Sequence, residues 1–328
     1  MKRQMLLLAA LLMVGLGAWA QKAEQKFNPK KFQVFAVGFY NQENLFDTCH
    51  DAGKNDYEYL PAKGWNSEKY TSKLKNMSRA LADMGTDVLP DAGCAFIGLA
   101  EVENANVLKD LTAQPPLKAR NMQFCHIEGP DKRGIDCALL YNPALFTVKN
   151  VKLVPYVQEL AKDSAFYTRG FLTVRGEMAG DDVAVIVCHW PSQFSGSFYR
   201  ESGARQTKAV KDSLLRLNPE MKVFVMGDMN DDPTSKSMYE VLRAQPEISE
   251  VGEGDMYNPW YNILAKEEKG TLYYRGKWNL FDQIVLTPNL LNKDGKKKGY
   301  RSLKYWNHQV FRRDYLIQQE GRYQGAPL

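Results

Sequence analysis

Five stretches of the chain share one pattern, a short apolar run next to a cluster of polar residues. The runs lie at 32–40, 95–100, 183–188, 223–226 and 279–286, and in the last of them an aspartate stands near the start. Apolar runs of this length are typical of buried strands. Each of the five presents an Asn, Glu, His or Asp at one end, and five unrelated turns would hardly do so. The pattern predicts a site assembled from several strand ends, where α/β proteins usually carry their functional residues.

The most informative of these segments reads VMGDMNDDP, at 225–233. Its Asp228 and Asn230 stand two apart, and residues two apart in an extended backbone point to the same side. We therefore expect both side chains to project together from the strand end. An aspartate can hold or deprotonate a water molecule, and an amide can orient a phosphate oxygen without adding negative charge. Asp, Asn, Gly and Pro also form ordinary polar turns, so the other segments decide between the two interpretations.

Helical periodicity separates several of the strands. The segment 67–84 has apolar side chains three and four residues apart, with Ser67 as its expected N-cap. Two further helices are predicted at 199–217 and 235–243. Strands that alternate with helices favour a layered α/β fold.

The polar clusters occur in the order seen in the endonuclease/exonuclease/phosphatase superfamily, the DNase I-like metal-dependent phosphoesterases. The matching segments are NQENLFD, GLAEVEN, DCALLYNP, VCHWPSQ, VMGDMNDDP and FDQIVLT. On these motifs the chain resembles that superfamily from about residue 32 to residue 286. The resemblance implies one α/β domain, 21–328, built as a four-layer sandwich of two packed mixed β-sheets flanked by helices.

The resemblance also implies a divalent-metal site. By similarity, Glu101 is the principal metal ligand, and Asn41 lies beside it. Hard oxygen ligands of this kind suit Mg²⁺, Mn²⁺ or Ca²⁺ rather than Zn²⁺. Because Mg²⁺ keeps several of its waters, one or two protein carboxylates suffice to hold it. We therefore expect Mg²⁺ as the cofactor, or Mn²⁺ or Ca²⁺ in its place.

By the same similarity, four residues form the catalytic set, and Asp136 is a further candidate from its place in the sequence. Asp228 would orient or deprotonate the attacking water, Asn230 would hold the phosphoryl group, and His189 would hydrogen-bond a non-bridging oxygen. A lone histidine after an apolar run is more often a core residue, and the resemblance reverses that expectation for His189. Asp282 matches the aspartate that orients a second histidine. Asp136 is the candidate carboxylate for orienting His189 itself.

The second histidine of the family pattern, in a Ser-Asp-His tripeptide, is absent after Asp282. The only late histidine is His308, which lacks the preceding aspartate. Three interpretations remain: a truncated sequence that also lacks the last strand of the fold, His308 as a stand-in, or a natural protein without this histidine. General acid–base assistance is worth roughly 10²–10⁴ in rate, so the choice affects the expected activity.

The N-terminus has the composition of a secretion signal at 1–20. Lys2 and Arg3 give it a basic start, 5–17 is apolar, and Ala20 ends a small-residue cleavage pattern. The apolar run is shorter than the roughly 20 residues that a membrane span needs, which disfavours an uncleaved anchor. We expect cleavage near Ala20, export to the periplasm or the outside, and no stable membrane insertion.

Charge says little about the substrate. Lys2 and Arg3 account for two of the 43 basic residues, which leaves 41 against 38 acidic residues and a net charge of +3. A net charge of this size does not by itself indicate a nucleic-acid-binding protein. The superfamily cleaves nucleic acids, phosphoinositides, sphingomyelin and small phosphoesters, and export favours scavenging of nucleic acid over DNA repair. We expect a nuclease-like phosphodiesterase. The alternatives are a phospholipase C or sphingomyelinase, a small-molecule phosphatase, and an inactive binding module.

Overall fold

The computed structural model describes residues 33–160, 166–267, 269–293 and 301–327. The chain divides into two units, Met1–Gln33 and Val34–Leu328, and the fold described below is that of the second unit. The predicted signal peptide, 1–20, lies outside the described residues. Among the described residues, no helix combines the length and the apolar character that crossing a membrane requires.

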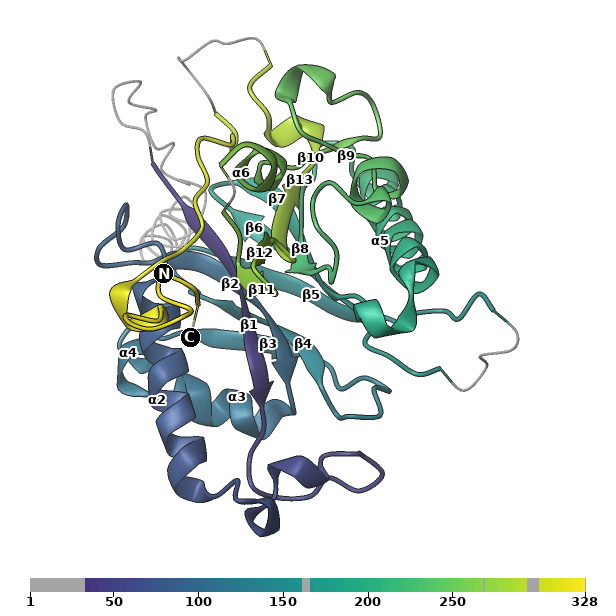
Figure 1. Cartoon of the computed structure of the whole chain (residues 1–328). Helices are drawn as coiled ribbons and strands as arrows, with labels where there is room; N and C mark the ends of the chain where they lie inside the picture. Colours follow the sequence, from purple (N-terminus) through teal and green to yellow (C-terminus); the bar gives the residue numbers. More distant parts are fainter. Residues whose placement is uncertain (1–32, 161–165, 268, 294–300, 328) are drawn as a thin grey trace, which may run out of the picture. The chain divides into compact units, whose positions relative to one another are not determined.

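Two large mixed β-sheets form the centre of this unit (Figure 1). The four-stranded sheet has the order β1-β2-β4-β3 and the seven-stranded sheet the order β5-β6-β7-β8-β13-β10-β9. The strands of the first sheet are β1 (Ala36–Leu45), β2 (Cys94–Val102), β3 (Gln123–His126) and β4 (Asp136–Tyr141). Those of the second are β5 (Thr147–Val154), β6 (Phe171–Met178), β7 (Asp181–His189), β8 (Lys222–Asp228), β9 (Ala244–Gln245), β10 (Met256–Tyr257) and β13 (Asp282–Leu286). A separate hairpin joins β11 (Leu272–Tyr274) to β12 (Lys277–Asn279).

Helices flank the two sheets. The α-helices are α2 (Ser67–Asp83), α3 (Ala105–Thr112), α4 (Pro115–Lys118), α5 (Ser197–Leu217) and α6 (Trp260–Glu267). The 3-10 helices are η1 (Tyr57–Tyr59), η2 (Pro61–Lys63), η4 (Gln193–Ser195), η6 (Ile248–Glu250), η7 (Pro288–Leu290) and η8 (Asp314–Leu316), and η5 (Ser237–Val241) is a π-helix.

Three buried apolar clusters correspond to the contacts between layers. One lies between the sheets, where Phe96 of β2 meets Phe224 of β8. A second packs α2 and α3 on the four-stranded sheet, and a third packs α5 on β7 and β8. Burial of these side chains, at about 25 cal/mol per Å² of apolar surface, holds the layers together. The predicted α/β class, with two mixed sheets flanked by helices, is confirmed.

Several element bounds differ from the prediction. The N-cap of α2 is Asn66, whose side chain accepts a hydrogen bond from the Lys69 amide at 3.0 Å, rather than the expected Ser67. The first strand was expected to end at residue 40 but continues to Leu45. The helix expected at 235–243 shortens to η5, Ser237–Val241. Polar residues at the ends of helices and strands add little to the hydrophobic periodicity of the sequence. The sequence pattern therefore does not fix these bounds, and tertiary contacts decide them.

The strands that matter for function are direct neighbours. β7 and β8 run parallel with His189 opposite Asp228, and β13 runs antiparallel to β8 with Asp282 opposite the same Asp228. Close approach of β7 and β8 requires Gly227, because a Cβ atom there would lie 2.1 Å from the Cys188 carbonyl oxygen. This packing brings three of the predicted residues to one sheet end.

Candidate active site

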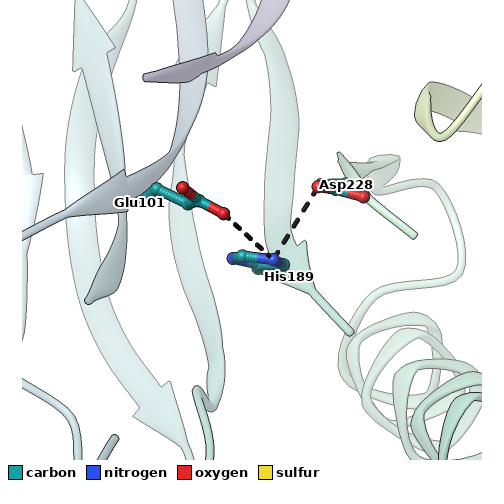
Figure 2. A group of neighbouring side chains, drawn as sticks. All are labelled: Glu101, His189 and Asp228. Carbon is teal, nitrogen blue, oxygen red and sulfur yellow. Dashed lines mark ion pairs between the residues drawn. The ribbon is translucent and has the colours of Figure 1, made fainter. Parts of the chain in front are cut away.

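Glu101, His189 and Asp228 lie together at the ends of strands from both sheets. His189 Nε2 is 3.8 Å from Glu101 Oε1 and 3.7 Å from Asp228 Oδ2, and Figure 2 shows the ring between the two carboxylates. One ligand atom from each residue lies within 4.8 Å of the others. The structure thus brings together the residues predicted from the ends of β2, β7 and β8.

Glu101 has an unusual backbone conformation, with φ at 59°. The pairing of β2 with β4 is interrupted between Leu99 and Val102, and the pairing of β1 with β2 is irregular between Asn41 and Leu45. Irregularities of this kind re-aim a side chain out of the normal alternation of a strand. The bulged end of β2 therefore places the Glu101 carboxylate beside His189.

Hydrogen bonds hold the Asp228 carboxylate from both sides. Asn41 Nδ2 donates to Asp228 Oδ2 at 3.0 Å, and the Asn230 amide nitrogen donates to Asp228 Oδ1 at 2.8 Å. The side-chain oxygen Oδ1 of Asn41 accepts a hydrogen bond from the Glu43 backbone amide at 2.8 Å and keeps a second lone pair. Asn41 therefore lies beside the Asp228 carboxylate, in the group of residues where we expected it.

Asn230 reaches the site by a route that differs from the prediction. β8 ends at Asp228, and Asn230 lies beyond the strand with φ at 50°. Its side-chain Nδ2 donates to the Trp190 carbonyl oxygen at 2.9 Å. The expected alternation of an extended backbone is wrong here, because a tight turn closed by Asp228 positions Asn230.

Asp136 does not contact His189 as expected. Its Oδ2 lies 3.0 Å from His126 Nε2, and its Oδ1 accepts a hydrogen bond from the Gly129 amide at 3.0 Å. His126 is on β3, the direct neighbour of β4, so it reaches Asp136 within the same sheet. Within the described residues, His189 Nδ1 is buried without a hydrogen-bond partner. The predicted Asp136–His189 hydrogen bond is wrong for this physical reason.

Asp282 and His308 lie in different environments. Burial and the charge of Asp228 raise the pKa of Asp282 well above its usual value. His308 Nδ1 lies 2.5 Å from the Tyr305 hydroxyl oxygen, and its ring packs edge-on against Trp260 at 5.4 Å. His308 therefore belongs to an aromatic cluster, and its side-chain hydrogen bond joins it to Tyr305.

The electrostatics of the site favour a bound cation. Burial raises the pKa of Asp228 to about 6, and the nearby charge of Glu101 adds to this shift. Burial, together with Arg169 and Arg133, lowers the pKa of His189 well below its usual value, so the ring is neutral. Carboxylates held close together repel each other, and a cation between them removes that repulsion.

The donor atoms suit a divalent cation. Two ligand atoms that each lie about 2.0–2.6 Å from an ion are separated by at most about 4–5 Å. The 4.8 Å spread of the ligand atoms of Glu101, His189 and Asp228 satisfies this limit. Two carboxylates give the hard oxygen character that Mg²⁺, Mn²⁺ and Ca²⁺ share. The residues present therefore fit the metal that the sequence led us to expect.

A pocket of about 220 Å³ adjoins this group and contains residues that the sequence analysis missed. Arg133 and Arg169 line it, and Arg133 Nη2 is 3.9 Å from Glu101 Oε2. Arg169 donates to the Trp190 carbonyl oxygen at 2.9 Å. The Thr168 hydroxyl oxygen and Arg169 Nε are buried without a partner among the described residues. These residues lie in loops, so the apolar pattern of the strands did not point to them. The only available signal was that Arg133 and Arg169 each stand shortly before a buried strand, β4 and β6.

The match to a known family agrees with this description. The sequence profile of the Endonuclease/Exonuclease/phosphatase family matches residues 36–328. No match was found among curated proteins. Similar solved structures include a mannosyl-6-phosphatase from Bacteroides thetaiotaomicron, with 14% identity over 78% of this chain and 86% of that chain and a TM-score of 0.48. Truncated TDP2 from Caenorhabditis elegans has 14% identity over 68% of this chain and 79% of that chain, with a TM-score of 0.46. Because the family profile spans most of the sequence, the chain belongs to the endonuclease/exonuclease/phosphatase family of hydrolytic phosphoesterases.

Proposed function

We propose that the protein is a divalent-metal-dependent phosphodiesterase that hydrolyses nucleic acid. The observation that carries this proposal is the grouping of Glu101, His189 and Asp228 beside a pocket that contains two arginines. A phosphodiester is an anion, and both a cation between carboxylates and guanidinium groups bind such an anion. The arrangement supports attack on a phosphoryl group.

Glu101 and Asp228 are the residues that would hold the metal, with Asn41 next to them. When bound, the ion would polarise a phosphoryl oxygen and offset negative charge in the transition state. Arg133 would add positive charge from the pocket side, because its guanidinium already lies near Glu101. Together these groups would stabilise the charge that develops during hydrolysis.

Asp228 is the candidate base for the attacking water. Burial raises the pKa of its carboxyl to about 6 without a metal, and a bound cation would lower that pKa, so Asp228 would be ionised when it orients the water. The hydrogen bonds from Asn41 and Asn230 fix its orientation. His189, neutral and buried, would donate a hydrogen bond from Nε2 to a non-bridging oxygen. Burial and the neighbouring charge of Asp228 raise the pKa of Asp282, which favours the neutral form of its carboxyl group.

A panel of substrates tests this proposal. The purified chain would be assayed with Mg²⁺ or Mn²⁺ on bis(p-nitrophenyl) phosphate, DNA, RNA, sphingomyelin and p-nitrophenyl phosphate. We expect metal-dependent hydrolysis of the diester and of nucleic acid, abolished by EDTA and by Glu101→Gln. Hydrolysis of sphingomyelin alone would replace the proposal with the phospholipase C or sphingomyelinase alternative, and hydrolysis of the monoester alone would replace it with the phosphatase alternative. Metal binding without any hydrolysis would indicate a binding module.

A further inference from the structure

Aromatic side chains border the pocket on two segments of the chain. The pocket is lined by Phe166 and Tyr167 from one segment and by Ser192 and Ser195 from another. Phe194 lies between these two serines in the sequence. Tyr167 is 54% exposed and Phe194 is fully exposed. Large aromatic side chains are mostly buried in folded proteins, so a group of exposed ones beside a reactive site points to a ligand.

Ring contacts join the segment before β6 to the start of α5. The ring of Phe166 lies 4.8 Å from that of Tyr199, which lies 5.8 Å from Phe198 at the start of α5. Phe198 is 37% exposed. The Tyr156 hydroxyl donates to the Tyr199 carbonyl oxygen at 3.2 Å, so the described residues after β5 lie against the beginning of α5. The aromatic side chains therefore extend outward from the pocket.

Cations accompany these rings. Lys132 Nζ lies 5.6 Å from the centre of the Tyr167 ring, and Arg205 Cζ lies 5.6 Å from that of Phe198. Arg133 lies deeper, in the pocket itself. Surfaces that bind single-stranded nucleic acid combine aromatic rings, on which the bases stack, with basic side chains that contact the phosphate backbone. Arg205 is also paired with Glu159 at 2.5 Å, so the cations next to the pocket are Lys132 and Arg133, and an apolar partner would offer Lys132 no counter-charge.

Only an unpaired base offers both of its faces to an aromatic ring, because the bases of a duplex are stacked on each other. The reacting groups are also recessed, since the side chains of Glu101 and Asp228 are only 13% and 12% exposed. A flexible single strand can enter such a recess more readily than a duplex.

We propose that Tyr167, Phe194 and Phe198 form a platform on which unpaired bases stack, so that the substrate is single-stranded nucleic acid. This inference rests on the proposed phosphodiesterase function, because it names the substrate of the same site. The platform would guide the strand so that one phosphate lies over Glu101 and Asp228. DNA and RNA share the chemistry that such a platform recognises.

Binding can be tested separately from hydrolysis. In the Glu101→Gln background, fluorescence anisotropy would measure the affinity for labelled DNA and RNA strands of about ten nucleotides. Phe194→Ala should weaken binding about five- to thirtyfold, as expected for the loss of one stacked base. Phe194→Leu should weaken it similarly, because leucine lacks a ring, and Phe194→Trp should restore it. Tyr323→Ala, at an exposed aromatic outside the pocket lining, is the matched control and should have no effect.

Two results would overturn the platform. One is equal affinity for the single strand in Phe194→Ala and Tyr323→Ala, and the other is tighter binding of a blunt duplex than of either single strand. Failure of the proposed function would look different, because the wild-type chain would then leave bis(p-nitrophenyl) phosphate intact in Mg²⁺ or Mn²⁺. Since Phe194 is fully exposed, its replacement leaves the core unchanged, and equal thermal midpoints would verify this.

Discussion

Replacement of Glu101 by glutamine removes one charge from the site with almost no change in shape. His189 Nε2, at 3.8 Å, and Arg133 Nη2, at 3.9 Å, are too far from the Glu101 carboxylate for hydrogen bonds. The substitution also relieves repulsion of Asp228, whose pKa Glu101 helps to raise. Without metal, we therefore expect the free energy of unfolding to stay within about 1 kcal/mol of the wild-type value or to rise slightly.

Metal should stabilise the wild-type chain and not the variant. A ligand at ten to a hundred times its dissociation constant adds about 1.4–2.7 kcal/mol to the stability of the folded state. For a chain of this size, that free energy raises the thermal midpoint by roughly 2–4 °C. Loss of the principal carboxylate ligand should remove this shift, because the remaining donors of Asp228 and Asn41 hold the ion only weakly.

Differential scanning fluorimetry in EDTA and in millimolar Mg²⁺ or Mn²⁺ measures both effects, and titration calorimetry gives the affinity. Glu177→Gln is the matched control, because Glu177 lies on β6, is half-exposed and pairs with Lys149. We expect the control to keep the full metal-dependent shift. An equal shift in wild-type protein and Glu101→Gln would refute the assignment of Glu101 as principal ligand.

Three further predictions concern other parts of the chain. Gly227→Ala should lower stability by about 3 kcal/mol or more, since its Cβ would meet the Cys188 backbone, whereas Gly98→Ala should cost about 1 kcal/mol because the flexible end of Met226 can move; urea unfolding compares the two. His189→Ala should reduce hydrolysis of bis(p-nitrophenyl) phosphate by roughly 10²–10⁴, while His308→Ala should change it little, and comparable losses would contradict the site as described. Expressed in a Gram-negative host, the chain should be processed near Ala20; an intact Met1 found by mass spectrometry in the membrane fraction would count against export.

The sequence could predict the strands and the residues at their ends, because short apolar runs and their polar ends are local features. It therefore brought Glu101, His189 and Asp228 together correctly. It could not predict the partner of Asp136, since His126 reaches it only through the pairing of β3 with β4. Arg169 was missed because its position depends on how its loop folds over the end of β7, which no local pattern records.

The left-handed backbone of Glu101 and Asn230 has a consequence for engineering. In this conformation, a residue with a side chain is about 1–2 kcal/mol less favourable than glycine. Glycine at position 101 would thus relax the backbone while it removes the carboxylate. A library selected for heat resistance alone should therefore enrich glycine at position 101 and recover better-folded proteins that have lost their chemistry. Such a selection needs a second screen for turnover, because substitutions that raise thermal stability at this position lower catalytic activity.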